Sequence, residues 1–400
     1  MDKLVITRWK GKVLTAVFTD GKASSLTLEP ESSTLLDNIY IGKVQKVVSN
    51  IGAAFIEIGD GQTGYYSLEE NRPVVLNRPG AKKLSPGDEL IVQVSKDAVK
   101  TKAPVLTGRL TFTGRYCVLT PNKAGINFSA KLSDPALKRR LKPLLEEAAA
   151  SRGYRDCGLI VRTNAAGAEP EQILEELDSL FLIYQRVLEE SGHRTCYSCL
   201  YRSLPGYIAS LRDTYTGCLE SIVTDQEDYY QELGRYLRDH QKEDLERLSF
   251  YNDPLVGLSK VYSLEKAMED AMSCRVWLKS GGYLVIEPTE AMVVIDVNTG
   301  KYSGKKTLQE TILKINLEAA EEIGRQLRLR NLSGIIIVDF IDLEKEGDRE
   351  LLLRHLSEVT AKDPIKTTVV EMTKLNLVEM TRKKVRRPLH EQVASNTDEK

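Results

Sequence analysis

The sequence lacks the features of secreted, membrane-spanning and repetitive proteins. None of its 400 residues lie in a run approaching the ~18 consecutive apolar residues of a membrane span. The N-terminus, MDKLVITRWKGK, has no apolar signal core. The six cysteines are scattered along the chain, as is typical of reduced cytosolic thiols. No internal repeat or low-complexity tract is present. These absences predict a cytoplasmic globular protein with no membrane partner.

The sequence also lacks an excess of either charge. Lys and Arg total 56 and Asp and Glu total 57, which gives a formal net charge of −1 at pH 7. A chain so close to neutrality has no overall attraction for nucleic acid, so any basic surface must be local. This balance favours an enzyme that releases its product over a packaging protein. The length allows about two to four domains.

Two predicted strands each end on acidic or amide side chains. The run AMVVIDVN ends at Asp296 and Asn298, and GIIIVDFID ends at Asp339 and Asp342. A carboxylate directly after four apolar residues is costly to bury unless it meets a cation or a hydrogen-bonding partner. Two such acids on neighbouring strands would form a cage of oxygen ligands for a hard cation, typically Mg2+.

The stretch between these strands has the period of an amphipathic helix. Asn331 and Gly334 then end the helix, as Asn and Gly do at helix C-termini. Strand, helix and strand with short connections predict parallel strands, whose C-terminal ends share one edge of the sheet. Asp296 and Asp339 should therefore converge, although acids after buried strands also occur simply as turn or capping residues. The apolar face of the helix consists of Leu308, Ile312, Ile315, Ala319, Ile323 and Leu327.

The rest of the chain divides into β-rich and mixed segments. Five short β runs between Ile39 and about Pro121 suggest a small barrel of the OB type. From Pro388 on, the polar residues predict disorder. The other predicted elements are strands at 3–8, 12–19, 157–163 and 367–373, and helices at 134–151, 169–190 and 347–360.

Aromatic and basic residues of the predicted barrel form a second candidate site. On an OB scaffold, exposed aromatic rings stack nucleic-acid bases and nearby lysines neutralise phosphates. Phe55 follows two alanines in a strand, and Tyr65 and Tyr66 follow the next turn. Alternatively, Phe55 is a core residue and the lysines form a solvated face, since apolar strand positions are usually core. The clustered lysines are Lys96, Lys100 and Lys102.

Long motifs in this chain resemble the ribonuclease E/G family of endoribonucleases. IEPTEAMVVIDVNTGK and NLEAAEEIGRQLRLRNLSGIIIVDFIDL are similar to its catalytic core. NIYIGKVQKV with GAAFIEIG resembles its S1-type RNA-binding barrel, and GLIVRTNAAG resembles its sensor of 5′-phosphorylated RNA ends. The resemblance covers almost the whole chain. It implies a Mg2+-dependent enzyme that cleaves single-stranded RNA in ribosomal RNA maturation and messenger RNA decay, stimulated by a 5′-monophosphate.

The resemblance also implies the fold class. It is a multidomain α+β and α/β chain, in which an OB-type S1 barrel is inserted in an RNase H-like subdomain. A 5′-sensor subdomain and a DNase I-like catalytic α/β subdomain follow the barrel. The implied ranges are 1–37 and 206–270 (RNase H-like), 38–118 (S1 barrel), 119–205 (5′ sensor), 271–387 (catalytic) and 388–400 (disordered tail).

Carried over residue by residue, the family's Mg2+-binding acids correspond to Asp296 and Asp339, and its catalytic asparagine to Asn298. The implied nucleophile is a water that the metal activates. An amide cannot act as a base, so Asn298 is suited to orient water or a phosphoryl oxygen. Asp342 lies three residues after Asp339 and would face the other way in a strand, which leaves it an outer position.

The family's sensor and RNA-contacting residues also correspond to positions here. The sensor falls on Arg162, Thr163 and Lys366, where Lys366 replaces an arginine of the family pattern and loses its forked hydrogen bonding. Arg162 could alternatively form a salt bridge within its own domain. The barrel contacts correspond to Phe55, Tyr65, Lys96 and Lys102.

Cysteine usage differs from the family pattern. Family members carry a CPxC motif after the nuclease subdomain, through which two protomers share a zinc ion. The residues after Met380 contain no cysteine, so we do not expect the zinc link, and the homodimer is in question. Cys196 and Cys199, with His193, form half a zinc motif at a different place, or simply two buried thiols. A non-catalytic RNA-binding protein acting with ribosomal RNA is the alternative function.

Overall fold

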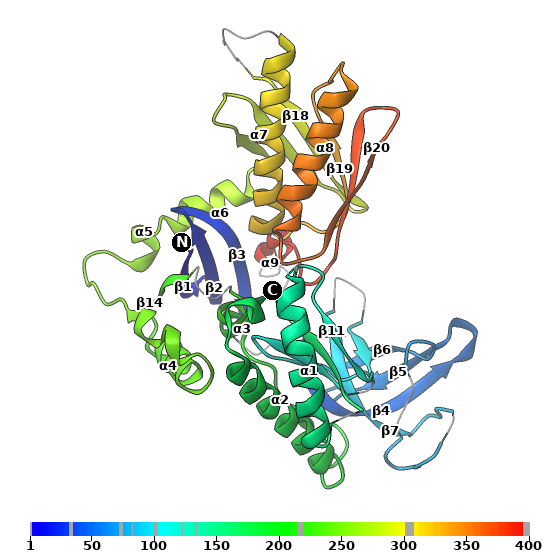
Figure 1. The fold of residues 1–400 in the computed structure, drawn as a ribbon. Coiled ribbons are helices and arrows are strands. Elements are labelled where there is room, and N and C mark those ends of the chain that lie inside the picture. The colour runs from blue at the N-terminus through cyan, green and yellow to red at the C-terminus, as the bar shows by residue number, and fades with distance from the viewer. Residues whose placement is uncertain are drawn as a thin grey trace. The chain divides into compact units, whose positions relative to one another are not determined.

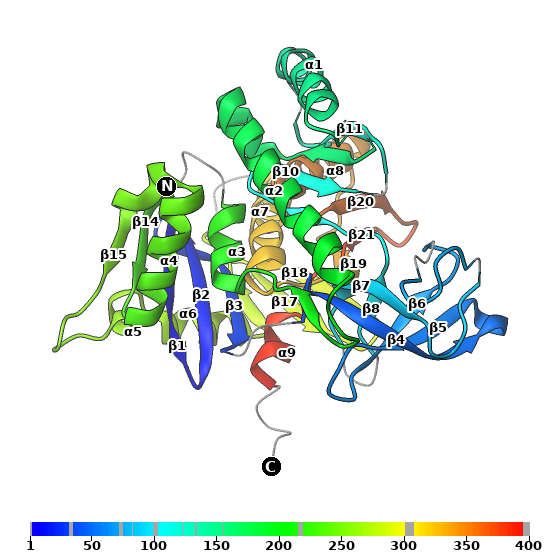
Figure 2. The ribbon, with the colours of Figure 1, turned by 90° about the horizontal axis from the view of Figure 1, so that it is seen from below.

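The computed structural model describes residues 2–31, 35–71, 75–81, 83–98, 103–121, 123–132, 134–154, 156–214, 219–300 and 308–394, without the side chain of Leu308. The chain forms two compact units (Figures 1 and 2). We call Met1–Glu31 together with Glu220–Lys400 the discontinuous unit, and Ser32–Leu219 the inserted unit. None of the helices in the described residues has the length and apolar composition of a membrane span.

The discontinuous unit contains a five-stranded sheet built from both ends of its sequence. The hairpin turns at Lys10–Gly11 and Asp20–Gly21 have positive φ at both residues, which matches the right-handed twist of the flanking strands. The strand predictions for 3–8 and 12–19 are confirmed. The strand order is β15 (Leu248–Phe250), β14 (Leu219–Thr224), β1 (Asp2–Trp9), β2 (Lys12–Thr19) and β3 (Lys22–Pro30).

The helices near this sheet include one that the sequence did not predict. Leu389 in α9 is fully buried, and the side-chain oxygen of Gln392 accepts a hydrogen bond of 2.7 Å from the backbone N–H of Leu28 in edge strand β3. The prediction of disorder from Pro388 is therefore wrong for Leu389–Ala394, because these residues pair with the sheet edge. The helices of this part are α4 (Glu227–His240), α5 (Leu258–Val261), α6 (Leu264–Met272) and α9 (Leu389–Ala394), with the 3-10 turn Lys242–Arg247.

A six-stranded sheet in the same unit contains the predicted strand–helix–strand segment. One face is covered by α7 (Leu308–Leu329) and α8 (Glu346–Ala361), which Figure 1 shows packed together against the strands. After α7, Asn331 and Gly334 adopt positive φ, which confirms the predicted helix end. The strand order is β16 (Arg275–Trp277), β17 (Tyr283–Pro288), β18 (Met292–Asn298), β19 (Gly334–Asp339), β21 (Leu377–Arg382) and β20 (Thr367–Met372), and only β18–β19 is parallel among these pairs.

The inserted unit begins with a closed five-stranded barrel, as the sequence predicted (Figure 2). Pairing between its first strand and β7 closes the ring. A Cβ on Gly64 would lie 2.5 Å from the side chain of Leu106, so only glycine allows this close approach. The barrel strands in order are β4 (Ile39–Val48), β5 (Ala53–Glu57), β6 (Thr63–Ser67), β8 (Val105–Thr107) and β7 (Glu89–Lys96), and β13 (Cys199–Tyr201) extends β4.

The rest of the inserted unit is a small sheet with helices. The helices predicted at 134–151 and 169–190 are confirmed, and the side chain of Asp134 caps the first by accepting from the N–H of Ala136 at 2.8 Å. The finer subdomain boundaries stay predictions. The elements are β9 (Phe112–Thr113), β10 (Cys117–Thr120), β11 (Gly125–Phe128), β12 (Gly158–Val161), α1 (Pro135–Ser151), α2 (Pro170–Ser191) and α3 (Gly206–Asp213), with 3-10 turns Ser49–Ile51 and Thr163–Gly167.

Candidate active site

The two strand-end acids meet at one edge of the parallel strand pair. Asp296 in β18 lies directly beside Asp339 in β19 in the strand register. The amide nitrogen of Asn298 donates a hydrogen bond of 2.7 Å to Asp296 Oδ2. Because their strand neighbours Val297 and Val338 are buried under α7 and α8, these polar groups lie on the opposite face of the sheet. The geometry expected from the strand–helix–strand pattern is therefore present.

The electrostatics of this edge suit a divalent cation. Partial burial, followed by the negative charges of Asp296 and Asp342, raises the pKa of Asp339 above its ordinary value. A bound cation would relieve this crowding of like charges. The described residues contain no cluster of three or more His, Cys, Asp or Glu placed to hold a metal. Mg2+ commonly binds through one or two carboxylates, with water and substrate phosphate completing its shell.

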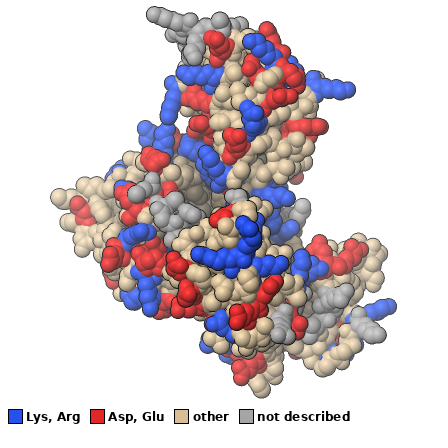
Figure 3. Space-filling model, in the orientation of Figure 1, with Lys and Arg blue, Asp and Glu red and all other residues tan. Residues whose placement is uncertain are grey.

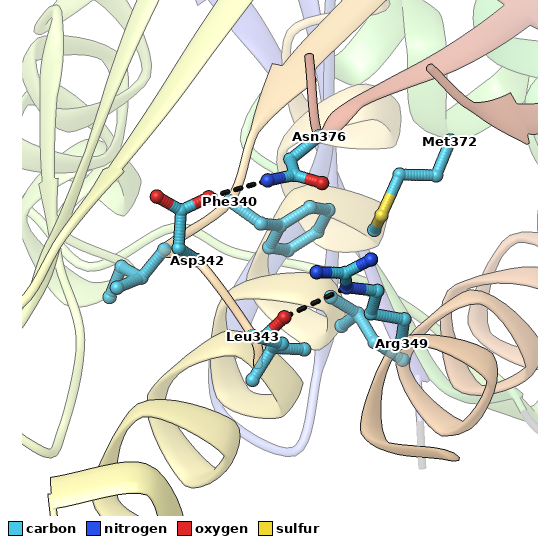
Figure 4. A pocket seen from close by; sticks show the side chains of 8 residues that line it. Phe340, Asp342, Leu343, Arg349, Met372 and Asn376 are labelled. Carbon is cyan, nitrogen blue, oxygen red and sulfur yellow. Dashed lines mark hydrogen bonds between the residues drawn. The ribbon is translucent and has the colours of Figure 1, made fainter. Parts of the chain in front are cut away.

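The expectation for Asp342 depended on strand alternation continuing beyond Asp339. Strand β19 ends at Asp339, so the alternation of side chains does not extend to Asp342, and its charge acts on Asp339. The alternation on which that expectation rested therefore does not apply at Asp342, and the outer position stays a prediction. Asn376 donates a hydrogen bond of 2.8 Å to Asp342 Oδ1, as Figure 4 shows beside a small hollow. The buried Asn316 fixes the connecting loop by bonding both backbone groups of Ile341.

Three residues on the same face were not singled out from the sequence. Trp277 pairs with Tyr283 across β16 and β17, and Tyr283 in turn lies opposite Asn298. Arg275 is two residues before Trp277, and its guanidinium lies over the Tyr283 ring, 4.6 Å from the ring centre. The sequence signal was the alternation in RVWLKSGGYLVIEP, but only the strand register shows which alternating set faces Asp296.

Three of the four barrel residues predicted to contact RNA, namely Phe55, Tyr65 and Lys96, lie in one row across four strands. Phe55 lies opposite Tyr65, with ring centres 6.3 Å apart in an edge-to-face arrangement. Val105 lies beside Tyr65 and opposite Lys96, so Lys96 continues the row. Phe55 and Tyr65 are half-buried and Lys96 is exposed. The alternative in which Phe55 is a core residue is thus not what the structure shows.

The other barrel residues divide between core, surface and undescribed chain. Tyr66 is fully buried and belongs to the barrel core. Lys46, which the sequence reasoning missed, is exposed and lies opposite Phe55 at the other end of the row. A bulge in β4 between Val44 and Lys46 shifts the register there and concealed this position. Lys100 and Lys102 lie outside the described residues. We call Lys46, Phe55, Tyr65, Val105 and Lys96 the barrel row.

The predicted 5′-phosphate sensor residues are engaged in other contacts or lie in another unit. Arg162 Nη1 lies 2.8 Å from Asp213 Oδ1 and donates 2.6 Å to the carbonyl of Gly114, so it forms the intradomain salt bridge considered from the sequence. Burial acts to raise the pKa of Asp213, but the guanidinium groups of Arg212 and Arg162 outweigh burial and hold that pKa below its usual value.

Thr163 and Lys366 complete the predicted sensor set. The hydroxyl of Thr163 lies 3.4 Å from that of Ser129, at the start of a 3-10 turn. Lys366 is exposed, and it belongs to the discontinuous unit, whereas Arg162 and Thr163 belong to the inserted unit. The structure therefore does not gather the three residues within one unit.

Cys196 and Cys199 both contact backbone carbonyls. Cys196 Sγ lies 3.9 Å from the carbonyl of Ile41, and Cys199 Sγ lies 3.3 Å from that of Tyr201. Both side chains are partly buried, and burial raises the pKa of both thiols. Half a zinc motif and two buried thiols both stay predictions for this pair.

Comparison with known proteins accords with this geometry. Residues 111–385 match the ribonuclease E/G family. The chain belongs to that family. It is 34% identical over 384 residues to ribonuclease E of a Nostoc species, covering 94% of this chain and 55% of the relative. It is 35% identical over 370 residues to ribonuclease G of Haemophilus influenzae, covering 89% of this chain and 74% of the relative.

Another relative is ribonuclease G of Escherichia coli, which is 32% identical over 398 residues, covering 96% of this chain and 80% of that protein. This ribonuclease E/G family member spans little more than half the length of the ribonuclease E proteins it matches. Figure 3 shows basic and acidic side chains intermixed on one face, in line with the net charge of −1.

Proposed function

We propose that this chain is a Mg2+-dependent endoribonuclease that cleaves single-stranded RNA in ribosomal RNA maturation and messenger RNA turnover. The observation that carries the proposal is the pairing of Asp296 with Asp339, next to Asn298, in a member of the ribonuclease E/G family. A protein that only binds RNA has no need to place two carboxylates side by side where they repel each other and the phosphate backbone.

The roles of the three polar residues follow from their chemistry. Asp296 and Asp339 would hold the cation, which when bound lowers the pKa of water and neutralises charge developing on phosphate. Asn298 gives one amide hydrogen to Asp296, and this bond fixes the orientation of its side chain. Its second amide hydrogen and its carbonyl oxygen remain suited to orient a phosphoryl oxygen or a water molecule.

RNA capture is assigned to the barrel row. Phe55 and Tyr65 present ring edges and faces for base stacking, and Lys46 and Lys96 lie at the two ends of the row, where they would neutralise phosphates. We assign Lys102 to the same task on the family pattern. Local placement of these lysines agrees with a chain that has no net positive charge.

Stimulation by a 5′-monophosphate is proposed through Arg162, Thr163 and Lys366. Arg162 already binds Asp213, so a terminal phosphate has to compete with, or add to, an existing carboxylate partner. Lys366 supplies a point charge without the planar fork of arginine. We expect the preference for a phosphorylated end to be smaller than an arginine at both positions would give.

The proposed activity is tested with a short A/U-rich single strand that carries either a 5′-monophosphate or a 5′-hydroxyl. Wild type is compared with Asp296→Asn, each with and without Mg2+. We expect cleavage only with Mg2+, and a loss of about a hundredfold or more in the variant, the scale of removing one group that stabilises developing charge. An inert wild type, or a variant that cuts equally well, would refute the enzymatic role and favour an RNA-binding role for the barrel row. Equal cleavage of the two ends would refute the sensor assignment alone.

A further inference from the structure

Three side chains on the edge of the catalytic sheet form a compact aromatic and cationic cluster. The rings of Trp277 and Tyr283 have centres 5.2 Å apart and planes inclined by 58°. The guanidinium of Arg275 lies 4.6 Å from the centre of the Tyr283 ring and 5.9 Å from that of Trp277. Such stacking of a cation on aromatic faces orders the three side chains relative to one another. We call these three residues the edge cluster.

Strand register places the edge cluster next to the candidate active site. One cross-strand row runs from Trp277 to Tyr283 and then to Asn298. Directly opposite residues in an antiparallel pair have Cβ atoms about 4.5–5.5 Å apart. The neighbouring row runs from Arg275 through Val285 and Asp296 to Asp339. The two rows lie on one face of the sheet, because the intervening residues of β17 and β18 belong to the buried core.

The cluster leaves a large apolar ring uncovered. Trp277 is 64% exposed, and it lies in β16, the three-residue strand at the end of the sheet order. Exposing a tryptophan forgoes much of the free energy that burial of its ring would contribute. Tyr283 is only half-buried, so the two rings present a continuous apolar surface beside polar groups. A ligand that covers this surface must itself be flat and apolar on one face.

The charges of the same surface indicate what else the ligand carries. Among the described residues, Arg275 forms no ion pair with a carboxylate, so its positive charge is free to meet an anion. The adjacent acids Asp296 and Asp339 would be neutralised by the proposed cation. A nucleotide combines a planar base with an anionic phosphate, which matches an aromatic surface beside a guanidinium. A hydrophobic peptide would fill the aromatic surface but leave Arg275 without an anion.

We propose that Arg275, Trp277 and Tyr283 form a stacking subsite for one unpaired RNA base that flanks the scissile phosphate. The base stacks on Trp277, and Arg275 binds the adjoining phosphate. This inference rests on the proposed function, since the substrate of Asp296 and Asp339 must be RNA. The subsite lies in the discontinuous unit and the barrel row in the inserted unit. It therefore selects the position of the cut relative to a base, whereas the barrel captures RNA in general.

Binding is measured in an Asp296→Asn background, so that the RNA stays intact. Oligonucleotides carry a single abasic site that is moved one position at a time through the sequence. We expect Trp277→Ala to weaken binding of intact RNA about tenfold, within the range of one base–aromatic stack. At one position, the abasic site should weaken binding to the parent protein but have no further effect on Trp277→Ala.

Two variants control for general effects. Trp277→Phe keeps a stacking face and should restore most of the affinity. Phe250→Ala removes another exposed aromatic residue, which lies in β15 of the other sheet of this unit and contacts Tyr230 of α4. It should leave RNA binding unchanged. Melting temperatures of all variants should stay close to that of the parent, because Trp277 is mostly exposed.

Fluorescence supplies a readout that a merely structural role would not change. The chain has two tryptophans, Trp9 and Trp277, so a Trp9→Phe protein reports on Trp277 alone. Stacking of a base on the ring should quench this emission when RNA is added, and the abasic site at the critical position should abolish the quenching.

The outcomes separate this proposal from the proposed function. If wild type cuts RNA, but Trp277→Ala binds RNA as tightly as its parent and Trp277 emission does not change when RNA is added, the subsite alone is overturned. That result includes the case in which the edge cluster binds a protein. Position-specific loss of binding in a protein that never cuts RNA would support the subsite and overturn the endoribonuclease. A wild type that neither binds nor cuts single-stranded RNA would overturn both.

Discussion

The barrel row and the face of the six-stranded sheet that carries Asp296 and Asp339 are built in the same way but with charges of opposite sign. Both bring aromatic rings and charged groups from four strands into rows across a sheet. In the barrel, the aromatic pair of Phe55 and Tyr65 lies between lysines. On the six-stranded sheet, the aromatic pair of Trp277 and Tyr283 lies beside paired carboxylates. Lysines attract phosphate without help, but paired carboxylates repel it until a cation binds. Under the proposed function, this comparison would separate RNA capture, which needs no metal, from RNA cleavage, which requires one.

The largest effect is expected from removing one acid of the pair. Asp339→Asn should lower kcat by about a hundredfold or more. The proposed cation loses one of its carboxylate ligands, so the charge that develops on the phosphate is stabilised less well. The dissociation constant for RNA should not rise, since the substitution removes a negative charge near phosphate. Single-turnover cleavage and fluorescence anisotropy measure the two quantities. A variant with normal kcat and weak RNA binding would place capture, rather than chemistry, on this face.

The barrel should respond in the reverse manner. Phe55→Ala or Tyr65→Ala should raise the dissociation constant for single-stranded RNA about tenfold, with little change in single-turnover kcat at saturating RNA. Ile51→Ala is the matched control, because Ile51 is an apolar residue with 57% exposure in the same barrel, outside the row. A change in kcat instead of affinity would contradict the division between the two regions.

Salt dependence provides a finer measure of the lysines in the row. For single strands, each neutralised phosphate contributes about −0.7 to the slope of log K against log salt concentration. Lys46→Ala and Lys96→Ala should each reduce the steepness of this slope by about that amount. Lys142→Ala should leave it unchanged, since Lys142 lies on α1 and pairs with Glu146 at 3.9 Å. Equal slopes in all four proteins would show that the row does not contact phosphate.

The smallest predicted effect concerns the titration of the catalytic edge. Burial and the charges of Asp296 and Asp342 raise the pKa of Asp339, so Asp342→Asn should lower that pKa toward its ordinary value. In metal-free protein, a raised pKa in the folded state favours folding with Asp339 protonated. This contribution to the free energy of unfolding is lost as pH rises through the folded-state pKa of Asp339. Because that pKa is less raised in Asp342→Asn, the loss of stability with rising pH should be smaller in this variant.

NMR titration of the Asp339 carboxyl carbon in metal-free protein measures the shift. Asp348→Asn, in the first turn of α8, is the control substitution and should leave the titration as it is in wild type. An unchanged or higher pKa in Asp342→Asn would show that the negative charge of Asp342 does not reach Asp339.

The pairing of Asp296 with Asp339 could be predicted from the sequence between them. The apolar period of α7 and the two short connections sufficed to predict that Asp296 and Asp339 lie together, because one helix between two strands fixes the topology. The assignment of Phe55 and Tyr65 rested on the family resemblance instead. The residues alone left Phe55 a core candidate and did not distinguish Tyr65 from Tyr66, which is buried.

The features that the sequence did not reveal depend on contacts between distant segments. Arg162 forms an ion pair with Asp213, which lies at the end of helix α3, and no local sequence pattern indicates that pair. The side chain of Gln392 pairs with the backbone of Leu28, 364 residues away, and this contact orders a segment whose composition predicts disorder. The position of Trp277 relative to Asn298 required the register of two antiparallel strand pairs.

The order of strands in the first sheet has a consequence for synthesis on the ribosome. Strand β1 lies between β2 and β14, but the inserted unit separates β14 from β3 in the chain. At typical translation rates, roughly 190 inserted residues delay the arrival of β14 by about 10–40 s. During that interval both edges of the three-stranded β1–β3 sheet are open, and the apolar edge strand β1, which contains Leu4 and Ile6, lacks its final neighbour. The nascent chain thus has a defined window in which chaperone binding would prevent aggregation, and the window closes when β14 joins the sheet.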